Sequence, residues 1–597
     1  MRNVRSSAKL AAVAAAGALA LAACGGGGGS SGGGGTSTGA APAFNISTTT
    51  IINPSDKTGG TIKLGAGSDC DSWDPARAYY GFCWNLQRLY ARTLMGFAPD
   101  PKKASTVVPD LATAPGESSA DFKTFKYTLR DGVKFQDGTP ITSKDIKYAL
   151  ERAYATDVIN GGPTGYFLCL LDTCPDGSTP TYKGPYKDKS GEPKVNGQPS
   201  MQTPDDKTII FHLTQPYASF DFLMAMGPSS PIPQAKDDGE NYTQHPVSSG
   251  PFKISQYNKD TGITFVRNTN WAQASDQIRK PKADSIEITY ITNLDDLDQR
   301  LKAGTLDARV DADLQPTFQN EAMADPNLKK NVDNPVDGSL RYLGVSPDVK
   351  PLDNIHCRKA VFYAINKEAW RLAYGGAITG DIAPSPTPAG LPGHDPKANM
   401  FPNGADFTGD INKAKDELNQ CGQPNGFSTN LAYVNQGTGP ARSAAVQEAL
   451  GRAGIKVTLK AGEADTYYSQ FIGSPASVKN NKLGLMDAGW GADFPTTVGF
   501  WYSIAAGSAN LPSADSNYVN LNDPKVNELL NRSNSAPQSE WDSIGRQVDD
   551  AVMANAVYLP IMWTKSVYWR NPRLTNVYST NFFGLYDWVN MGVSDGT

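Results

Sequence analysis

The clearest alternation of apolar and polar residues lies in the stretch Phe122–Arg152. Apolar residues alternate with polar ones from 125 to 129, which predicts a strand with one apolar face. Asp131-Gly132 can then turn the chain with glycine at positive φ, and the alternation resumes at 133–135. This pattern predicts a β-hairpin.

A helix is predicted after a second turn at Asp137-Gly138. Thr142 can cap the helix, and Asp145 lies three residues further on, in the first turn and near the positive end of the helix dipole. The apolar face consists of Ile146, Ala149, Leu150 and Ala153. Taken by itself, a hairpin followed by a capped helix is generic packing that carries no function.

Strand and helix patterns alternate along the rest of the chain, which predicts the α/β class. The predicted strands are 61–66, 207–213, 247–254 paired with 262–271, 286–291, 340–345, 430–434, 455–459, 483–488 and a strand from 557. The predicted helices are 84–94, 294–303, 356–374, 411–420 and 440–451. Residues 160–206 are rich in Gly, Pro, Lys and Asp, which predicts an irregular excursion.

Composition narrows the class of protein. A chain of 597 residues is long enough for several cores, and its 58 Gly and 42 Pro predict many turns and long connections. The formal net charge is −5. We therefore expect no nucleic-acid partner, which would require a basic surface.

The first 23 residues have the pattern of a secretory signal peptide. Arg2, Arg5 and Lys9 precede an apolar stretch at 10–21 that is short for a membrane span. The following Leu-Ala-Ala-Cys24 resembles a lipobox, which would make Cys24 the lipidated first residue of the mature chain. The alternative is secretion without a lipid, after cleavage near Ala23.

Residues 24–59 are predicted to form a lipidated linker rich in Gly and Ser. A flexible chain of about 35 residues has a root-mean-square reach on the order of 30 Å. A lipid anchor would hold the protein at a membrane without spanning it, and the linker would let it turn toward a partner in that membrane.

Six further cysteines in an exported chain favour disulfides, although six cysteines allow 15 pairings. Proximity along the chain favours Cys70–Cys83, Cys169–Cys174 and Cys357–Cys421. Metal binding is the competing interpretation, but the chain has no Cys-x-x-Cys and only four histidines, none spaced as in a zinc site. We expect no metal and no cofactor.

The residues of the hairpin and helix carry a family resemblance. Leu129-Arg-Asp-Gly-Val-Lys-Phe135, followed by Asp137-Gly-Thr-Pro-Ile-Thr-Ser-Lys-Asp-Ile146, closely resembles the signature of family 5 of the extracytoplasmic solute-binding proteins of ABC importers. That class includes the dipeptide- and oligopeptide-binding lipoproteins. Segments 89–94, 247–254 and 353–366 are similar to further blocks of the family.

The resemblance implies an α/β, two-lobed periplasmic-binding-protein-like (type II, cluster C) fold with a hinge and an extra small domain. Lobe I would comprise 60–91, 207–339 and 556–597, with the extra domain at 92–206, and lobe II would comprise 340–555. The family also implies that the C-terminal tail returns to the first lobe.

The implied function is capture of extracellular peptides in the interlobe cleft by hinge closure, and delivery to an ABC permease and its ATPase. We expect a monomer, lipid-anchored to the outer face of the cytoplasmic membrane. A non-peptide solute such as an oligosaccharide, and a peptide sensor, are the alternatives. An extracellular hydrolase is the least favoured, because the chain has no Gly-x-Ser-x-Gly and no His-Glu-x-x-His. We therefore expect no enzyme.

The candidate ligand residues follow the predicted strand 483–488. A carboxylate at Asp493 can hold a free α-ammonium group, and aromatic residues at Trp490, Phe494 and Trp501 can exclude water from that contact. In peptide-binding members of the family a Trp-x-x-Asp at this point supplies the carboxylate for the amino terminus of the peptide. The alternative is that Trp490 belongs to the core and Asp493 caps a helix starting near Phe494.

Two further aromatic residues are candidates where the chain passes between the lobes. The resemblance places a cleft tyrosine at Tyr342, where the alternative is ordinary hinge packing, and Trp563 follows the return crossing. A basic partner for the peptide carboxylate stays open among Arg341, Arg358, Lys367 and Arg371.

Overall fold

The computed structural model describes residues 43–159, 161–311, 313–464, 466–510, 515–580 and 584–596. The predicted signal peptide 1–23, Cys24 and most of the predicted linker lie outside this part of the chain. Within it, no helix is both long and apolar enough to cross a membrane.

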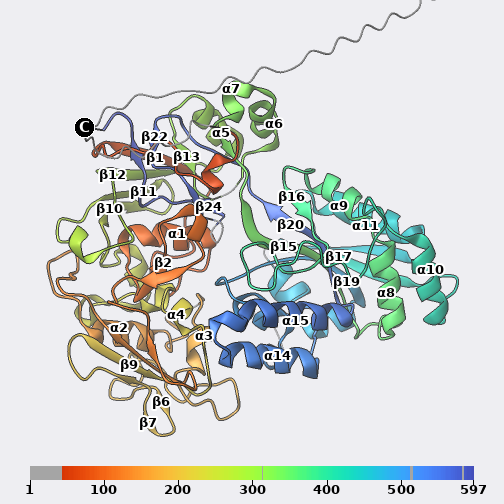
Figure 1. Cartoon of the computed structure of the whole chain (residues 1–597), viewed down its shortest axis with the longest axis horizontal. Coiled ribbons are helices and arrows are strands. Elements are labelled where there is room, and N and C mark those ends of the chain that lie inside the picture. The colour runs from red at the N-terminus through yellow and green to blue at the C-terminus, as the bar shows by residue number, and fades with distance from the viewer. Residues whose placement is uncertain are drawn as a thin grey trace, which may run out of the picture. The chain divides into compact units, whose positions relative to one another are not determined.

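The first lobe is built on a sheet with the strand order β10-β11-β12-β1-β13. Its strands are β10 (Phe252–Asn258), β11 (Gly262–Arg267), β12 (Ser285–Tyr290), β1 (Thr61–Ala66) and β13 (Ala308–Arg309). Strand β1 runs parallel to its neighbours β12 and β13, while β10 and β11 form the predicted antiparallel hairpin. Helix α1 (Gly81–Tyr90) packs on this sheet through Leu86 and Leu89, and α5 (Leu294–Lys302) follows β12 (Figure 1).

The extra domain has its own sheet, of order β4-β5-β9-β8. These strands are β4 (Glu117–Ser118), β5 (Thr124–Thr128), β9 (Thr208–His212) and β8 (Met201–Gln202). The predicted hairpin at Asp131-Gly132 is wrong in its pairing, although Gly132 does have a positive φ of 73°. Strand β5 pairs with β9 instead, because the alternating Ile209 and Phe211 continue the same buried face. Strand 208–212 therefore belongs to the extra domain, not to the sheet of lobe I.

Helix α2 (Ser143–Arg152) confirms the predicted cap. The Asp145 carboxylate accepts a hydrogen bond from the backbone N–H of Thr142 at 2.7 Å and another from its hydroxyl at 2.8 Å. Ile146 and Leu150 are fully buried in the core of the extra domain. The residues that resemble the family signature thus pack this helix against the small sheet.

The second lobe is built on a mixed sheet of order β16-β20-β15-β19-β17-β18. Its strands are β16 (Gly380–Ile382), β20 (Tyr558–Lys565), β15 (Val336–Val345), β19 (Leu483–Gly491), β17 (Ser428–Val434) and β18 (Lys456–Gly462). The predicted boundaries at 340 and 555 differ from this arrangement. Strand β15 begins at Val336, and β20 pairs with it antiparallel, so the chain returns to lobe I only after β20.

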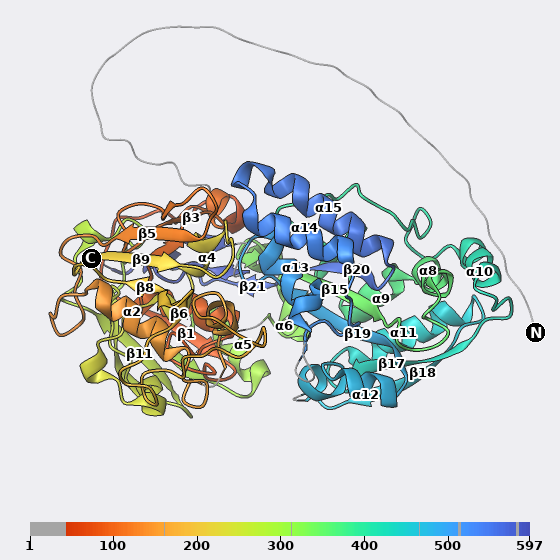
Figure 2. The same cartoon turned by 90° about the horizontal axis from the view of Figure 1, so that it is seen from below.

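Helices cover both faces of this second sheet. On one face, Leu340 and Tyr342 of β15 pack with α13 (Thr497–Ala505), α14 (Pro524–Ser535) and α15 (Trp541–Ala554). On the other face lie α8 (Ile355–Ala364), α9 (Lys367–Tyr374), α10 (Ile411–Gln420) and α11 (Gly439–Gly451). Figure 2 shows α14 and α15 side by side, apart from α8 to α11.

The single long helix predicted at 356–374 is wrong. The chain breaks at Ile365, whose backbone is extended, and Asn366 starts α9 by accepting a hydrogen bond from the N–H of Ala369 at 2.8 Å. An asparagine that satisfies a free N–H at a helix start is a cap, and the apolar periodicity alone does not show it.

The remaining elements are short. The helices are α3 (Gly165–Leu168), α4 (Phe220–Leu223), α6 (Pro316–Ala324), α7 (Pro326–Lys329) and α12 (Pro475–Asn480). The strands pair as β2 (Met95–Phe97) with β3 (Val107–Pro109), β6 (Lys194–Val195) with β7 (Gln198–Pro199), β14 (Val332–Asp333) with β21 (Tyr568–Trp569), β22 (Leu574–Thr575) with β25 (Gly592–Val593), and β23 (Ser579–Thr580) with β24 (Leu585–Tyr586).

The end of the predicted linker belongs to the folded first lobe. Residues 43–59 include a short 3-10 helix at Ile46–Thr48, and Ile52 is fully buried. The N–H of Ile52 donates to the carbonyl of Val577 at 2.8 Å, which ties this segment to the C-terminal tail. The prediction that the linker extends to residue 59 is therefore wrong at this end.

All three predicted disulfides are present. They join Cys70 to Cys83, Cys169 to Cys174 and Cys357 to Cys421. The last links α8 to the end of α10 across 64 positions of the chain.

Candidate ligand-binding site

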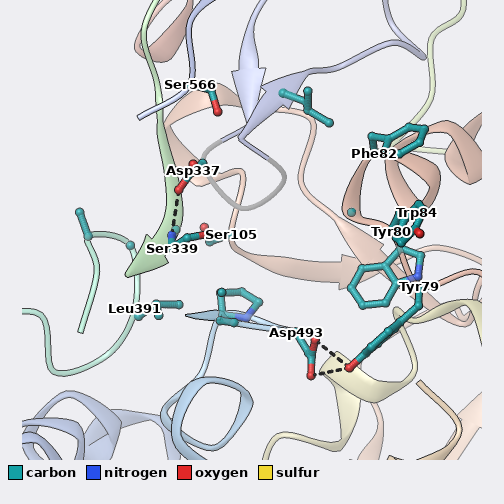
Figure 3. A pocket seen from close by; sticks show the side chains of 18 of the residues that line it. Tyr79, Tyr80, Phe82, Trp84, Ser105, Asp337, Ser339, Leu391, Asp493 and Ser566 are labelled. Atoms are coloured by element: carbon teal, nitrogen blue, oxygen red, sulfur yellow. Dashed lines mark hydrogen bonds between the residues drawn. The ribbon is translucent and has the colours of Figure 1, made fainter. Parts of the chain in front are cut away.

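A cavity of about 520 Å³ lies between residues of the two lobes. This volume is in the range of small-molecule sites, roughly 300 to 1,000 Å³. Segment 79–84 and Tyr568 line it from the first lobe, 337–339 from the start of β15, and 389–391 and 491–493 from the second lobe. Figure 3 shows Tyr79, Asp337, Leu391 and Asp493 around the cavity.

Asp493 lies two residues beyond the end of β19 and lines this cavity. The hydroxyl of Tyr79 donates to both of its carboxylate oxygens at 3.2 Å, as Figure 3 shows, and the hydroxyl of Tyr166 donates to Oδ2. Both tyrosines belong to the first lobe and its extra domain. The carboxylate of the second lobe is therefore held by neutral donors from the first.

The environment of Asp493 suits the binding of a cation. Burial raises the pKa of its carboxyl group to about 6, while the hydrogen bonds from Tyr166 and Tyr79 act in the opposite direction. Within the described ranges, no lysine, arginine or histidine forms an ion pair with it. Asp493 is half-buried, and a partly desolvated carboxylate without a counter-ion costs free energy that a ligand cation can offset.

The predicted alternative role of Asp493 as a helix cap is wrong. Helix α13 begins at Thr497, and the hydroxyl of Thr496 accepts the hydrogen bond from the N–H of Gly499 at 3.0 Å. The side chain of Asp493 is thus not used by the helix.

The neighbouring candidates Trp490 and Phe494 pack into the protein on either side of Asp493 along the chain. The indole N–H of Trp490 donates to the carbonyl of Phe500 at 2.7 Å, so the half-buried ring packs toward the second lobe. Phe494 is fully buried in the core of the extra domain, where its ring lies 5.2 Å from that of Tyr166. Neither side chain is among the described residues around the 520 Å³ cavity.

The structure does not bring Tyr342, Trp501 and Trp563 to the cavity. All three are at most 8% exposed and belong to the core under α13, α14 and α15. The indole of Trp501 donates to Asp549 at 2.9 Å, and that of Trp563 to the carbonyl of Pro386 at 3.1 Å. Tyr342 points to this face because alternate residues of β15 face opposite sides of the sheet.

Sequence reasoning missed the aromatic wall of the first lobe. Tyr79 and Tyr80 are 43% and 53% exposed, and Phe82 and Trp84 line the cavity beside them. A run of four aromatic residues within six positions was the available signal, because a soluble surface does not need such a run. Only Trp84 was used, as part of a predicted helix.

Sequence reasoning also missed Asp311 and Asp337, which line the cavity with Ser339 and Ser566. These residues come from three separate segments of the chain, at 311, 337–339 and 566. No spacing along the chain brings them together, so no sequence signal pointed to them.

The four basic candidates for the ligand carboxylate are absent from the described cavity wall. Arg358 donates to the carbonyls of Leu352 and Asn555, Lys367 to the carbonyl of Ala383, and Arg371 pairs with Glu368. The guanidinium of Arg341 lies over the ring of Tyr374, at 5.5 Å from its centre.

Comparison with known proteins places this geometry in a family. The model of "Bacterial extracellular solute-binding proteins, family 5 Middle" matches residues 106–511. The glutathione-binding protein GsiB of Pectobacterium atrosepticum is 24% identical over 522 residues, which cover 86% of this chain and 91% of that protein. The oligopeptide-binding protein OppA of Bacillus subtilis is 26% identical over 448 residues, covering 72% and 74%.

Solved structures agree with the family match. The clavulanic acid biosynthesis oligopeptide binding protein 2 is 38% identical, with a TM-score of 0.89, over 94% of this chain and 100% of that one. DppA from Helicobacter pylori, in complex with the peptide STSA, shares the fold at 22% identity with a TM-score of 0.66, over 89% and 98%. These likenesses confirm the predicted two-lobed fold. The chain belongs to family 5 of the bacterial extracellular solute-binding proteins.

Proposed function

We propose that this protein captures peptides in the cavity between its lobes and holds their amino terminus at Asp493. The observation that carries the proposal is a desolvated carboxylate in the cavity, bound by two tyrosine hydroxyls and by no described cation. The bonds from the tyrosines engage a single charge, and an α-ammonium group would add the opposite charge and so form an ion pair with this carboxylate.

The relatives support peptides as the ligand class. Their names describe binding of glutathione, D,D-dipeptides and oligopeptides, and one solved relative holds a peptide. The cavity offers many backbone and hydroxyl groups, such as those of Ser105, Ser339 and Ser566, that can bond a peptide backbone whatever its sequence.

The captured peptide would pass to an ABC permease with its ATPase, which fits the extracytoplasmic location of the family. We propose that a lipid on Cys24 anchors the protein, as a monomer, to the outer face of the cytoplasmic membrane. Family members are solute-binding proteins, and we propose that this chain likewise releases its peptide unchanged.

The first test is native mass spectrometry on the lipid-free chain from Gly25 onward, purified without denaturation, with the released small molecules sequenced. We expect mixed peptides from the wild-type chain and their loss from Asp493→Asn, which keeps the shape of the side chain and removes its charge. Asp416→Asn, an exposed position on α10, is the matched control and should retain its peptides.

Two outcomes would contradict the proposal. Recovery of a single non-peptide solute would show that the ligand is not a peptide. Peptides retained unchanged by Asp493→Asn would show that Asp493 does not hold their amino terminus. Incubation of the eluted peptides with fresh protein, followed by mass spectrometry, tests turnover, and shortened products would indicate a hydrolase.

A further inference from the structure

The cavity between the lobes is lined by acidic side chains on different walls. Asp493 lies beside Tyr79, whereas Asp337 and Asp311 lie where β15 leaves the first lobe. Figure 3 shows Asp337 and Asp493 on separate sides of the space. Among the described residues that line it, none is a lysine, an arginine or a histidine.

Asp311 is already neutralised by the protein. Its Oδ1 lies 2.8 Å from Nε of Arg309, and its Oδ2 accepts the N–H of Gly67 at 2.6 Å. The arginine is 3% exposed and therefore stays behind the cavity wall. Asp311 therefore already has a cation of the protein in contact with it, although Arg309 also lies 4.0 Å from Asp298.

Asp337 differs from Asp311, because in the described part of the chain it forms no ion pair. The backbone N–H of Ser339 donates to Oδ1 at 3.0 Å, and the hydroxyl of Thr564 donates to the same oxygen. The side chain of Ser339 is a further hydrogen-bond partner of this carboxyl group. On the adjacent strand β20, Nζ of Lys565 lies 2.6 Å from Oδ2 of Asp381, so this lysine pairs with Asp381.

The groups around Asp337 stabilise its ionised form only in part. Burial raises the pKa of its carboxyl group, and the hydrogen bonds from Thr564 and Ser339 together with the positive charge of Arg341 offset this only in part. The protein therefore keeps at this wall a carboxyl group that has no cation in contact with it and whose ionised form is only partly stabilised.

We propose that Asp337 is a second cation site and that the protein selects peptides carrying a lysine or arginine side chain. The ligand would place its α-ammonium at Asp493 and the ammonium or guanidinium of that side chain at Asp337. This inference rests on the proposed function and adds the charge class of the substrate. Two positive groups at two separated carboxylates balance both charges, whereas a neutral peptide leaves Asp337 without a counter-ion.

The test is calorimetric titration of the chain from Gly25 onward with three pairs of tripeptides. Each pair carries arginine or citrulline at position 1, 2 or 3 among alanines, and citrulline keeps the shape of arginine without its charge. We expect arginine to bind about 10- to 100-fold more tightly than citrulline in at least one pair, the effect of a hydrogen bond to a charged group.

The variant Asp337→Asn should abolish that preference, because it keeps the hydrogen-bond acceptor and removes the charge. Asp337→Glu should retain part of it, and the exposed control Asp416→Asn all of it. Melting temperatures of the variants check folding.

Equal binding of arginine and citrulline peptides in all pairs, or a preference unchanged in Asp337→Asn, would overturn the inference while leaving peptide capture in place. Failure of all six peptides to bind would overturn both.

Discussion

At the scale of single residues, the chemistry of this protein is set by how carboxylates are paired. Asp311 binds Arg309 and Asp487 binds Arg442, and these pairs are structural. Asp493 accepts hydrogen bonds only from tyrosine hydroxyls among the described residues. An acid that lacks a counter-ion at a cavity wall is the residue to test for ligand binding.

The affinity for a peptide should fall on acidification through Asp493. Its pKa in the free protein is raised to about 6, and only the ionised form attracts an α-ammonium group. Protonation therefore weakens binding below that pH, and the association constant at pH 5 should be about tenfold lower than at pH 7. Titration calorimetry across this range measures it.

Two variants check the assignment of that pH dependence. Asp493→Asn should bind weakly and with a smaller change between pH 7 and pH 5. Tyr166→Phe removes a donor that stabilises the ionised carboxylate, so the fall in affinity should begin at a higher pH. Tyr154→Phe is the control, because that hydroxyl donates to the carbonyl of Leu168. An affinity independent of pH in the wild type would contradict the prediction.

At the scale of elements, strands β15 and β19 determine the position of the cavity. Strand β15 carries Asp337 and Ser339 at its start, and Ser339 pairs with Gly491 at the end of β19, two residues before Asp493. The helices on both faces of this sheet fix the strands in place. The Cys357–Cys421 disulfide then fastens α8 to α10 on one of those faces.

Removal of that disulfide should cost more stability than removal of Cys169–Cys174. Under the chain-entropy model, a link across 64 positions stabilises by about 4 kcal/mol and one across 5 positions by about 2 kcal/mol. Paired Cys→Ala substitutions avoid leaving a polar group at the fully buried Cys357. Chemical denaturation measures both losses, and equal losses would contradict the prediction.

At the scale of the whole molecule, the ligand site draws on both lobes. Tyr79 and Tyr568 belong to the first, Asp493 and Leu391 to the second, and Asp337 to the strand that joins them. A peptide bound there contacts both sheets, so its binding free energy adds to the stability of the arrangement in which the lobes meet.

A bound peptide should therefore raise the thermal stability of the protein. At a concentration of 100 times its Kd, a ligand that binds only the folded state stabilises it by about 2.7 kcal/mol. Tryptophan fluorescence during heating, with and without an arginine-containing tripeptide, measures the shift. The same tripeptide with an acetylated amino terminus lacks the ammonium group and should give little change. Equal shifts with both peptides would argue against Asp493 as the anchor.

Local features of the fold could be predicted from the sequence. Strand β1 and helix α10 begin and end where their periodicity predicts, and the cap of α2 is present, because neighbouring residues determine these elements. The sequence did not show which strands pair with each other. The alternation in β5 predicts a strand but does not reveal that its partner, β9, lies about 80 residues further on.

The sequence by itself determined the family and the α/β class, because short motifs and periodicities carry that information. It favoured the disulfide partners that the structure has, and it singled out Asp493 as a candidate. Only the tertiary structure decided which side chains surround that carboxylate. Tyr79 and Tyr166 come from distant segments, as does Asp337 on another wall of the cavity. Tyr342 and Trp501 turn into the core because each lies on the sheet or helix face that packs there. Burial and proximity across the chain are properties of packing, and no local pattern encodes them.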